Sequence, residues 1–207
     1  MTHFLVTGAS GLLGLNFSLK AASHHKVVGA VHQQFLHQAP FPTIQMDLAE
    51  EGAVEKLLQQ VQPEVVLHCA ALANVDQCEV EPELAFRVNA ELPGELAAVC
   101  KRRHIRLVHI STDAVFDGQR GDYRETDAAN PINIYASTKL AGEQAVRDAN
   151  PDAIIARVNF YGWSLKGQRS LAEIFYYTLW SNRPMRGFTD VFFCPFHVDQ
   201  LTDVILK

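Results

Sequence analysis

The chain has 207 residues, of which 48% are hydrophobic and 20% charged, and its formal net charge is −5. This composition is typical of a soluble globular protein with one substantial core, and the acidic balance excludes a basic surface that would gather nucleic acid. No apolar run is long enough to span a bilayer, and we find neither a secretory leader nor the paired cysteine spacing of a zinc site. The sequence therefore predicts a cytoplasmic protein that binds no metal, membrane or nucleic acid.

Short apolar runs and amphipathic stretches alternate along the chain. The apolar runs predict strands buried on both faces at 4–6, 27–31, 65–67, 107–110 and 154–158. A helical period is found at 12–22, 51–61, 82–100 and 135–150. We therefore predict an α/β fold, a doubly wound parallel sheet of the Rossmann type with helices on both faces.

The pattern changes after Val158. We predict a dinucleotide-binding domain over 1–160 and part of a C-terminal substrate-binding lobe over 161–207, truncated at the end of the chain. Within this lobe we expect helices at 170–180 and 198–207 and a short strand at 190–195. Four aromatic residues are expected to fill the core of the lobe, namely Phe188, Phe192, Phe193 and Phe196.

A glycine-rich turn follows the first predicted strand and opens the first predicted helix. Gly8 permits a tight turn, Gly11 lets backbone amides approach a diphosphate, and Gly14 allows close packing of helix on sheet. The unpaired N–H groups and the dipole of the helix favour an anion at this end. The residues that we predict to bind a dinucleotide here are Gly8, Ser10, Gly11, Leu12, Leu13 and Gly14. The alternative is a turn that only packs the helix on the sheet.

The end of the second predicted strand bears on the choice of cofactor. A site for NAD usually places an acid there, to bind the ribose hydroxyls, and this chain has His32, Gln33 and Gln34 instead. These side chains can donate hydrogen bonds to a 2′-phosphate, so NADP is slightly preferred over NAD. Asp47 and Leu48, which follow a strand ending at 46, are predicted to meet the adenine; a helix-capping Asp47 is the alternative.

Tyr135 and Lys139 lie four residues apart in the helix predicted at 135–150, and therefore on one face of it. An ammonium beside a phenol stabilises the phenolate, so we expect the pKa of Tyr135 to be lowered toward neutrality. Such a pair suits proton transfer. The spacing also occurs by chance in many helices, so its significance depends on the segments around it.

Those segments, taken together, resemble the extended short-chain dehydrogenase/reductase family and, within it, most of all the dTDP-4-dehydrorhamnose reductase group. The segments that carry the resemblance occur in the family's order at 7–14, 69–71, 75–79, 88–90, 110–118, 123–127, 135–143 and 157–162. Members of the family continue beyond the position of Lys207. The resemblance implies the nicotinamide cofactor, NADP or NAD, that the glycine-rich turn also suggests.

The resemblance assigns roles to three catalytic residues. Thr112 would hydrogen-bond the substrate oxygen, Tyr135 would exchange a proton with it, and Lys139 would lower the pKa of Tyr135 and hold the nicotinamide ribose. Asn89 would join a water-linked proton path or, alternatively, cap a helix kink. Ser111 would replace Thr112 in another register, or be a strand-end hydroxyl satisfied by backbone.

The remaining assignments follow from the same resemblance. Further residues implied to contact the cofactor are Cys69, Ala70, Ala71, Asn89, Ser111, Val158 and Asn159. Those implied to contact the substrate are Val75, Thr112, Asp113, Ala114 and Asn159.

Ala114 departs from the pattern of the family. The reductases usually have an aromatic residue at this position and the related dehydratases a Glu, so dehydration is disfavoured and the rhamnose-type substrate is less certain. The sequence predicts an NAD(P)-dependent oxidoreductase that acts on a keto or hydroxyl carbon of a sugar nucleotide. The alternatives are a sugar-nucleotide epimerase and a non-catalytic nucleotide-binding regulatory subunit. A homodimer through the helices predicted at 82–100 and 135–150 is left open.

Overall fold

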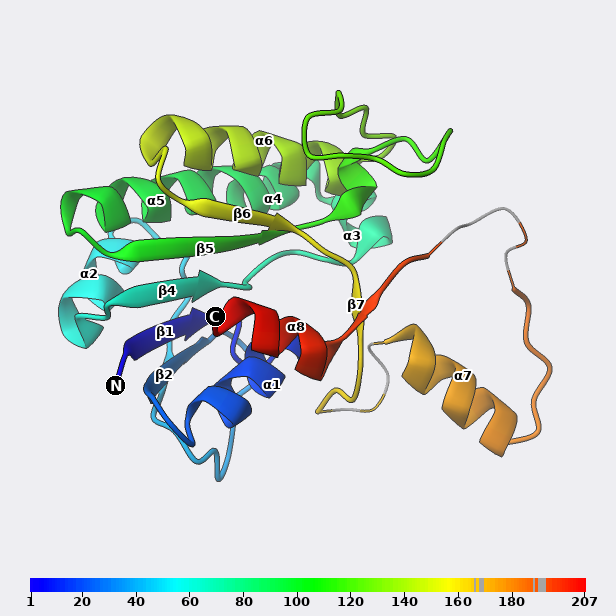
Figure 1. Ribbon diagram of the computed structural model, residues 1–207, viewed down its shortest axis with the longest axis horizontal. Helices are drawn as coiled ribbons and strands as arrows, with labels where there is room; N and C mark the ends of the chain where they lie inside the picture. Colours follow the sequence, from blue (N-terminus) through cyan, green and yellow to red (C-terminus); the bar gives the residue numbers. More distant parts are fainter. Residues whose placement is uncertain (166, 168–169, 188, 190–192) are drawn as a thin grey trace.

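The structure is a computed structural model that describes residues 1–165, 167, 170–187, 189 and 193–207. A parallel six-stranded sheet with the order β3-β2-β1-β4-β5-β6 forms its centre (Figure 1). Its strands are β1 (His3–Thr7), β2 (Lys26–Val31), β3 (Thr43–Gln45), β4 (Val65–His68), β5 (Arg106–Ser111) and β6 (Ile154–Arg157). The predicted α/β class and the five predicted strands are confirmed. The order reverses between β1 and β4, as in a doubly wound sheet.

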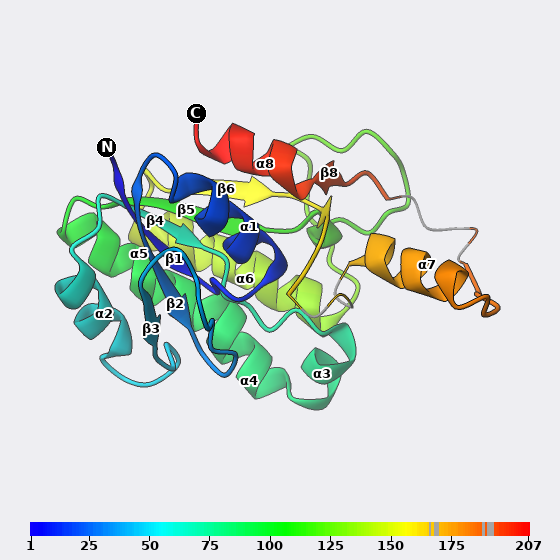
Figure 2. The same cartoon turned by 90° about the horizontal axis from the view of Figure 1, so that it is seen from below.

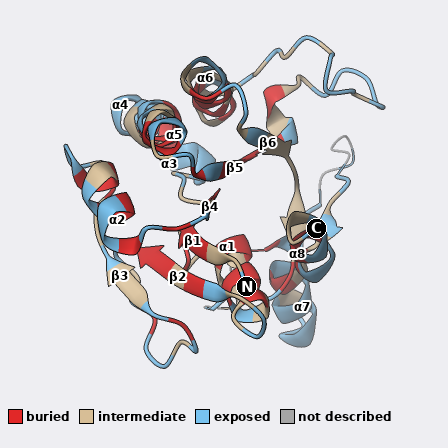
Figure 3. Ribbon diagram, turned by 60° about the vertical axis from the view of Figure 1, so that its left-hand side comes forward, coloured by how far each residue is buried: buried red, intermediate tan, exposed pale blue. Residues whose placement is uncertain are grey.

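Helices cover both faces of the sheet. The helices of the first part of the chain are α1 (Leu12–Ala21), α2 (Ala53–Val61), α3 (Val75–Val80), α4 (Pro82–Phe86) and α5 (Leu92–Arg102). They are followed by α6 (Ile134–Ala149), α7 (Leu171–Trp180) and α8 (Val198–Ile205). In Figure 3, buried residues gather along the strands and on the sides of the helices that face them.

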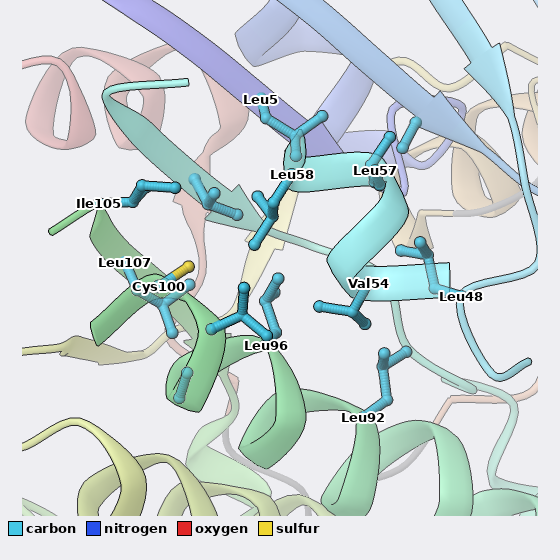
Figure 4. Close-up of a cluster of buried hydrophobic side chains, with 14 of the residues drawn as sticks. Leu5, Leu48, Val54, Leu57, Leu58, Leu92, Leu96, Cys100, Ile105 and Leu107 are labelled. Atoms are coloured by element: carbon cyan, nitrogen blue, oxygen red, sulfur yellow. The ribbon is translucent and has the colours of Figure 1, made fainter. Parts of the chain in front are cut away.

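One apolar core lies between the sheet and the helices α2 and α5 (Figure 4). In α2 the buried residues Val54, Leu57, Leu58 and Val61 recur at the spacing of one helix face, which is why this segment folds as an amphipathic helix. Each fully buried leucine contributes about 2 kcal/mol through the apolar surface that it removes from water. This core fixes the sheet edge from which the loops of the site extend.

The second core lies on the opposite face, between the sheet and α1 and α8. Phe4 and Phe17 meet there edge to face, with ring centroids 5.4 Å apart. Val198 and Leu201 of α8 belong to the same cluster, so the last helix packs against the first one. The division of the chain at 160/161 stays a prediction.

The helix predicted at 82–100 is interrupted by a π-helical turn, η1 (Arg87–Glu91), between α4 and α5. Pro93 has no N–H to offer the carbonyl four residues earlier, which is that of Asn89, and its ring would clash with that carbonyl. The wider turn relieves this conflict and directs the carbonyl of Asn89 towards α6. A Cβ atom on Gly142 of α6 would lie 2.1 Å from that oxygen, so only glycine fits there.

Other differences from the predicted elements are small. Helix α3, whose N-cap Asn74 accepts a hydrogen bond from the N–H of Gln77 (3.0 Å), was not predicted. Residues 190–192 of the strand predicted at 190–195 lie outside the described residues, and 193–195 form no strand. The second sheet instead pairs β7 (Phe160–Tyr161) with β8 (Phe196–His197).

Helix α7 projects away from the sheet (Figure 2). A capping box formed by Ser170 and Glu173 begins it. Leu179 and Trp180 at its other end are 73% and 78% exposed. No described helix is both long and apolar enough to cross a membrane.

The aromatic residues near the end of the chain do not form the core that we predicted. Phe193 and Phe196 are both exposed, because no described element covers them from outside. That prediction is therefore wrong for these two residues. Phe188 and Phe192, on which it also rested, lie outside the described residues.

Candidate functional site

A cleft of about 980 Å³ lies at the carboxyl ends of β1, β2 and β4. This is the edge of the sheet beside the reversal of strand order between β1 and β4, where open α/β sheets bind their ligands. Residues predicted to bind the dinucleotide line it, namely Gly8, Ser10, Gly11, Leu12, Leu13, Gly14, His32, Gln33, Asp47, Leu48, Cys69, Ala70 and Ala71. The fold thus brings four separate segments of the chain to one cavity.

The glycines of the first turn give the cleft its floor. Gly8 has φ +65°, a left-handed conformation that favours glycine, and a Cβ atom there would lie 2.9 Å from Cα of Ala70. A Cβ atom on Gly14 would lie 2.4 Å from the carbonyl oxygen of Gly8. Gly11 is the N-cap of α1 and has no side chain to satisfy the first N–H groups of the helix. These groups are left to face the cleft, as in a site for a phosphate.

His32 and Asp47 meet at the far side of the cleft. Nε2 of His32 lies 3.4 Å from a carboxylate oxygen of Asp47, and the side chain of Gln45 donates to the carbonyl of His32 (2.9 Å). Asp47 also accepts a hydrogen bond from the N–H of Ala49 (2.9 Å). Because α2 begins at Ala53 with Gly52 as its N-cap, Asp47 caps a turn and not a helix, and the alternative prediction is wrong.

The cleft includes residues that the sequence did not indicate. Gln34, Phe35 and His37 follow β2, and their position after a strand of a parallel sheet was a signal that was available. The opposite wall consists of Gln77, Leu84, Val88 and Leu92, from α3, α4, η1 and α5. No spacing in the sequence announced this wall, since α3 itself was not predicted.

A second group of side chains gathers just beyond β5. Thr112 is buried, and its hydroxyl accepts a hydrogen bond from the N–H of Ala114 (3.1 Å) and is hydrogen-bonded to Tyr135. Asp113 accepts a hydrogen bond from the side-chain amide of Asn159. The fold therefore brings Thr112, Asp113, Ala114, Tyr135 and Asn159 together. Val75 lies apart from them on α3, where it is exposed, and Val158 is half-buried on the α1 side of the sheet.

The pKa of Tyr135 is raised, and not lowered as the sequence led us to expect. Burial of the phenol is the largest cause, because it disfavours the phenolate, and negative charge at Cys78 and Asp113 acts in the same direction. The hydrogen bond with Thr112 opposes the shift. Lys139 does not lower this pKa in the structure, since its ammonium is directed elsewhere.

Lys139 is 3% exposed, and its ammonium donates a hydrogen bond to the carbonyl of Ile110 (2.7 Å). Burial lowers the pKa of Lys139 to about 8, and the neighbouring Glu143 and Cys69 act in the opposite direction. Ile110 also lines the cleft. The amine thus lies behind the wall that the cleft shares with Thr112.

Two predicted residues turn out to hold the site together. Ser111 donates a hydrogen bond to the carboxylate of Glu143 (2.6 Å), so the prediction that backbone groups satisfy its hydroxyl is wrong. Asn89, in the π-helical turn, donates to the carbonyl of Leu72 (3.0 Å) and to the hydroxyl of Thr138 (3.2 Å) and accepts from the N–H of Leu72 (2.9 Å). Both residues are buried, and neither lines the cleft. Among the described residues, no cluster of His, Cys, Asp or Glu is placed to hold a metal ion.

Comparison with known proteins gives consistent results. The RmlD substrate binding domain family matches residues 1–207. A probable low-salt glycan biosynthesis reductase of Haloferax volcanii is 46% identical over 165 residues, which are 77% of this chain and 54% of that protein. The methionine adenosyltransferase 2 subunit beta of Bos taurus is 37% identical over 156 residues, 74% of this chain and 45% of the relative. The chain therefore spans about half the length of these curated relatives.

Solved structures extend the comparison to the fold. A dTDP-4-dehydrorhamnose reductase from Bacillus anthracis, in complex with NADP, superposes with a TM-score of 0.81 and 28% identity. The match covers 100% of this chain and 70% of the reductase.

Proposed function

The chain belongs to the RmlD substrate binding domain family, within the extended short-chain dehydrogenases/reductases, and on this premise we propose that it is the cofactor-binding and catalytic part of a sugar-nucleotide reductase. The reaction is the reduction of a keto carbon to a hydroxyl, or the reverse, with NADP or NAD. The proposed location is the cytoplasm. A homodimer through α5 and α6 stays a prediction.

One observation carries the proposal: the cleft ends where the proton-transfer residues begin. Ile110 and Phe160 line the cleft, and these residues directly flank Ser111-Thr112 and Asn159 in the sequence. A ligand that fills the cleft from the glycine-rich turn would therefore present its far end to Thr112 and Tyr135. That is the arrangement that a nicotinamide site requires.

The residues present fit a dinucleotide. The close approaches at Gly8 and Gly14 leave a cradle without side chains, and the N-terminus of α1 offers free N–H groups to a diphosphate. A bound nicotinamide cofactor would supply the hydride. NADP is the slightly preferred cofactor, and the support for it is that His32 and Gln33 line the cleft and that the Bacillus anthracis relative is in complex with NADP.

The chain's own groups would handle the proton. Thr112 would donate a hydrogen bond to the substrate oxygen, and the phenol of Tyr135 would give its proton to the same oxygen during reduction. Because the pKa of Tyr135 is raised, the phenol holds its proton at neutral pH, which suits a general acid. The positive charge of Lys139 would stabilise the phenolate that remains.

The decisive test is a change of Tyr135 to Phe. We expect Tyr135→Phe to lower turnover of dTDP-4-dehydrorhamnose with NADPH by at least 10³-fold, because only the proton donor is removed. Binding of NADPH, measured by calorimetry, should change less than about threefold. Turnover by the variant within tenfold of the wild type would exclude this mechanism.

A non-catalytic nucleotide-binding subunit is the second candidate, and it is favoured by the likeness to the methionine adenosyltransferase 2 subunit beta. It predicts cofactor binding without oxidation or reduction across a panel of sugar nucleotides. An epimerase, the remaining alternative, would retain tightly bound NAD through purification. Absorbance of the denatured protein's supernatant near the nicotinamide band distinguishes the two.

A further inference from the structure

Three functional groups lie in a row along one face of α6. Tyr135, Lys139 and Glu143 follow one another at intervals of four residues, which places each about one turn after the last. Tyr135 and Lys139 belong to the proposed proton-transfer site. Glu143 has no place in that mechanism, although the same face of the helix presents it.

Glu143 is completely buried, with 0% exposure, and its carboxylate is held on several sides. Ser111 of β5 donates to it (2.6 Å), and Arg157 of β6 donates through Nε (2.9 Å) and Nη2 (2.7 Å). Arg147 lies at its solvent side, with Nη2 3.2 Å from the carboxylate. A buried carboxylate with this many donors remains ionised and cannot change its position easily.

We propose that Glu143, fixed by Ser111 and Arg157, is a positioning residue whose buried charge keeps the ammonium of Lys139 protonated beside Tyr135. The proposal rests on the role proposed for Lys139. It concerns an electrostatic effect through space, since the ammonium donates its hydrogen bond to Ile110 and the carboxylate accepts its own from Ser111 and the arginines.

The groups around Lys139 single out Glu143 as the source of negative charge. His68 of β4 and His109 of β5 face the amine, and burial lowers the pKa of both, so they are neutral. Cys69 follows β4, and burial raises the pKa of its thiol to about 12, so it is neutral as well. Glu143 therefore opposes the tendency of burial to remove the proton from Lys139.

Arg157 makes the proposal testable in two directions. Its guanidinium lies 5.0 Å from the centre of the Phe116 ring, which together with Glu143 fixes it in place. Neutralising Glu143 leaves the positive charge of Arg157 near Lys139, so the amine should lose its proton at lower pH. Neutralising Arg157 leaves the negative charge less compensated, so the amine should hold its proton to higher pH.

The experiment is an NMR titration of the Lys139 side chain in the whole chain labelled with ¹³C-lysine, assigned by comparison with Lys139→Met. We expect Glu143→Gln to move the midpoint down by about one pH unit or more, a roughly tenfold change in the ionisation constant. Arg157→Gln should move it up. Asp148→Asn is the matched control, because it removes the same charge from an exposed position on the same helix and should leave the midpoint within about 0.2 units.

A shift for Glu143→Gln no larger than that of Asp148→Asn, or in the same direction as Arg157→Gln, overturns the proposal. If Glu143→Gln does not fold, Arg157→Gln decides alone, and a midpoint that falls or stays in place is the contrary result. The titration needs no substrate, so it is independent of the proposed reaction. A wild type without turnover would overturn the proposed function while the midpoints still decide the role of Glu143.

Discussion

Burial of the ammonium of Lys139 places function and stability in opposition. Its pKa is lowered to about 8 from an ordinary value near 10.5, so the folded chain binds this proton less readily than the unfolded chain does. The resulting cost to stability is fully present below pH 8, declines as the pH rises, and is absent above about 10.5. The site therefore keeps its charge at the expense of the fold.

A neutral side chain at this position should release that cost. We expect Lys139→Met to raise the free energy of unfolding at pH 7 by about 2 kcal/mol, which is the gain of about 3 kcal/mol from the pKa shift less about 1 for the lost hydrogen bond to Ile110. Urea unfolding at pH 7 and at pH 10.5 measures it, and the gain should vanish at the higher pH. Equal gains at both pH values would show that packing, and not charge, is responsible. Turnover should be lost.

At this scale the sequence predicted the positions of the cofactor residues better than their electrostatics. The glycines of the first turn, His32 and Asp47 line one cleft, as their places after strands of a parallel sheet indicated. The direction of the Tyr135 pKa was predicted wrongly, because it depends on burial of the phenol. A helical spacing gives the neighbour of a residue but not its access to water.

Among the elements, the junction of the π-helical turn with α6 is the most constrained contact of the site. Pro93 displaces the carbonyl of Asn89, and Gly142 receives it with no room for a Cβ atom. A carbonyl at this distance has no flexible end that can move aside. The junction holds α6, with Tyr135 and Lys139 on it, at a fixed distance from α5.

Gly142→Ala should therefore be costly. We expect it to lower the free energy of unfolding by about 3 kcal/mol, because the added methyl group forces the two helices apart. The matched control is Gly121→Ala, where a Cβ atom meets nothing within 4 Å, and it should change stability by less than about 0.5 kcal/mol. Thermal unfolding of the three proteins decides it, and equal effects of both substitutions would contradict the account.

The sequence gave no direct warning of this junction. Its pattern for 82–100 is that of one continuous helix, and Pro93 alone indicates an irregularity without saying whether the helix ends, bends or widens. The outcome depends on the partner across the gap, Gly142, which is 49 residues away from Pro93 in the chain. Long strands and amphipathic helices were predictable because their own periodicity defines them. Short elements such as α3 and β7 depend on their neighbours.

At the scale of the whole molecule, α7 stands out because it is apolar on all sides and little covered. Leu179 and Trp180 are 73% and 78% exposed, and the rings of Tyr176 and Trp180 stack 6.1 Å apart on the same helix. Exposed apolar surface of this kind contributes little to the stability of the chain and promotes association.

The double substitution Leu179→Glu with Trp180→Ser should separate these two effects. We expect the free energy of unfolding to change by less than about 0.5 kcal/mol, since neither side chain is part of a core. Self-association, followed by sedimentation velocity, should decrease. The changes Leu57→Glu and Leu58→Ser in the core beneath α2 are the contrast, because they should unfold the chain. Unchanged association in the first variant would exclude α7 as its cause.

The clamp formed by Asn89 also has a consequence for how ligands communicate. Its side chain joins Leu72, which lines the cleft, to Thr138, which lies one turn after Tyr135 in the sequence of α6. A ligand that orders the segment around Leu72 thereby restrains the start of α6 as well. By thermodynamic reciprocity, whatever is bound next to Tyr135 must favour the first ligand by the same factor. The two ends of the cleft are then expected to bind their ligands cooperatively, with a single amide as the link.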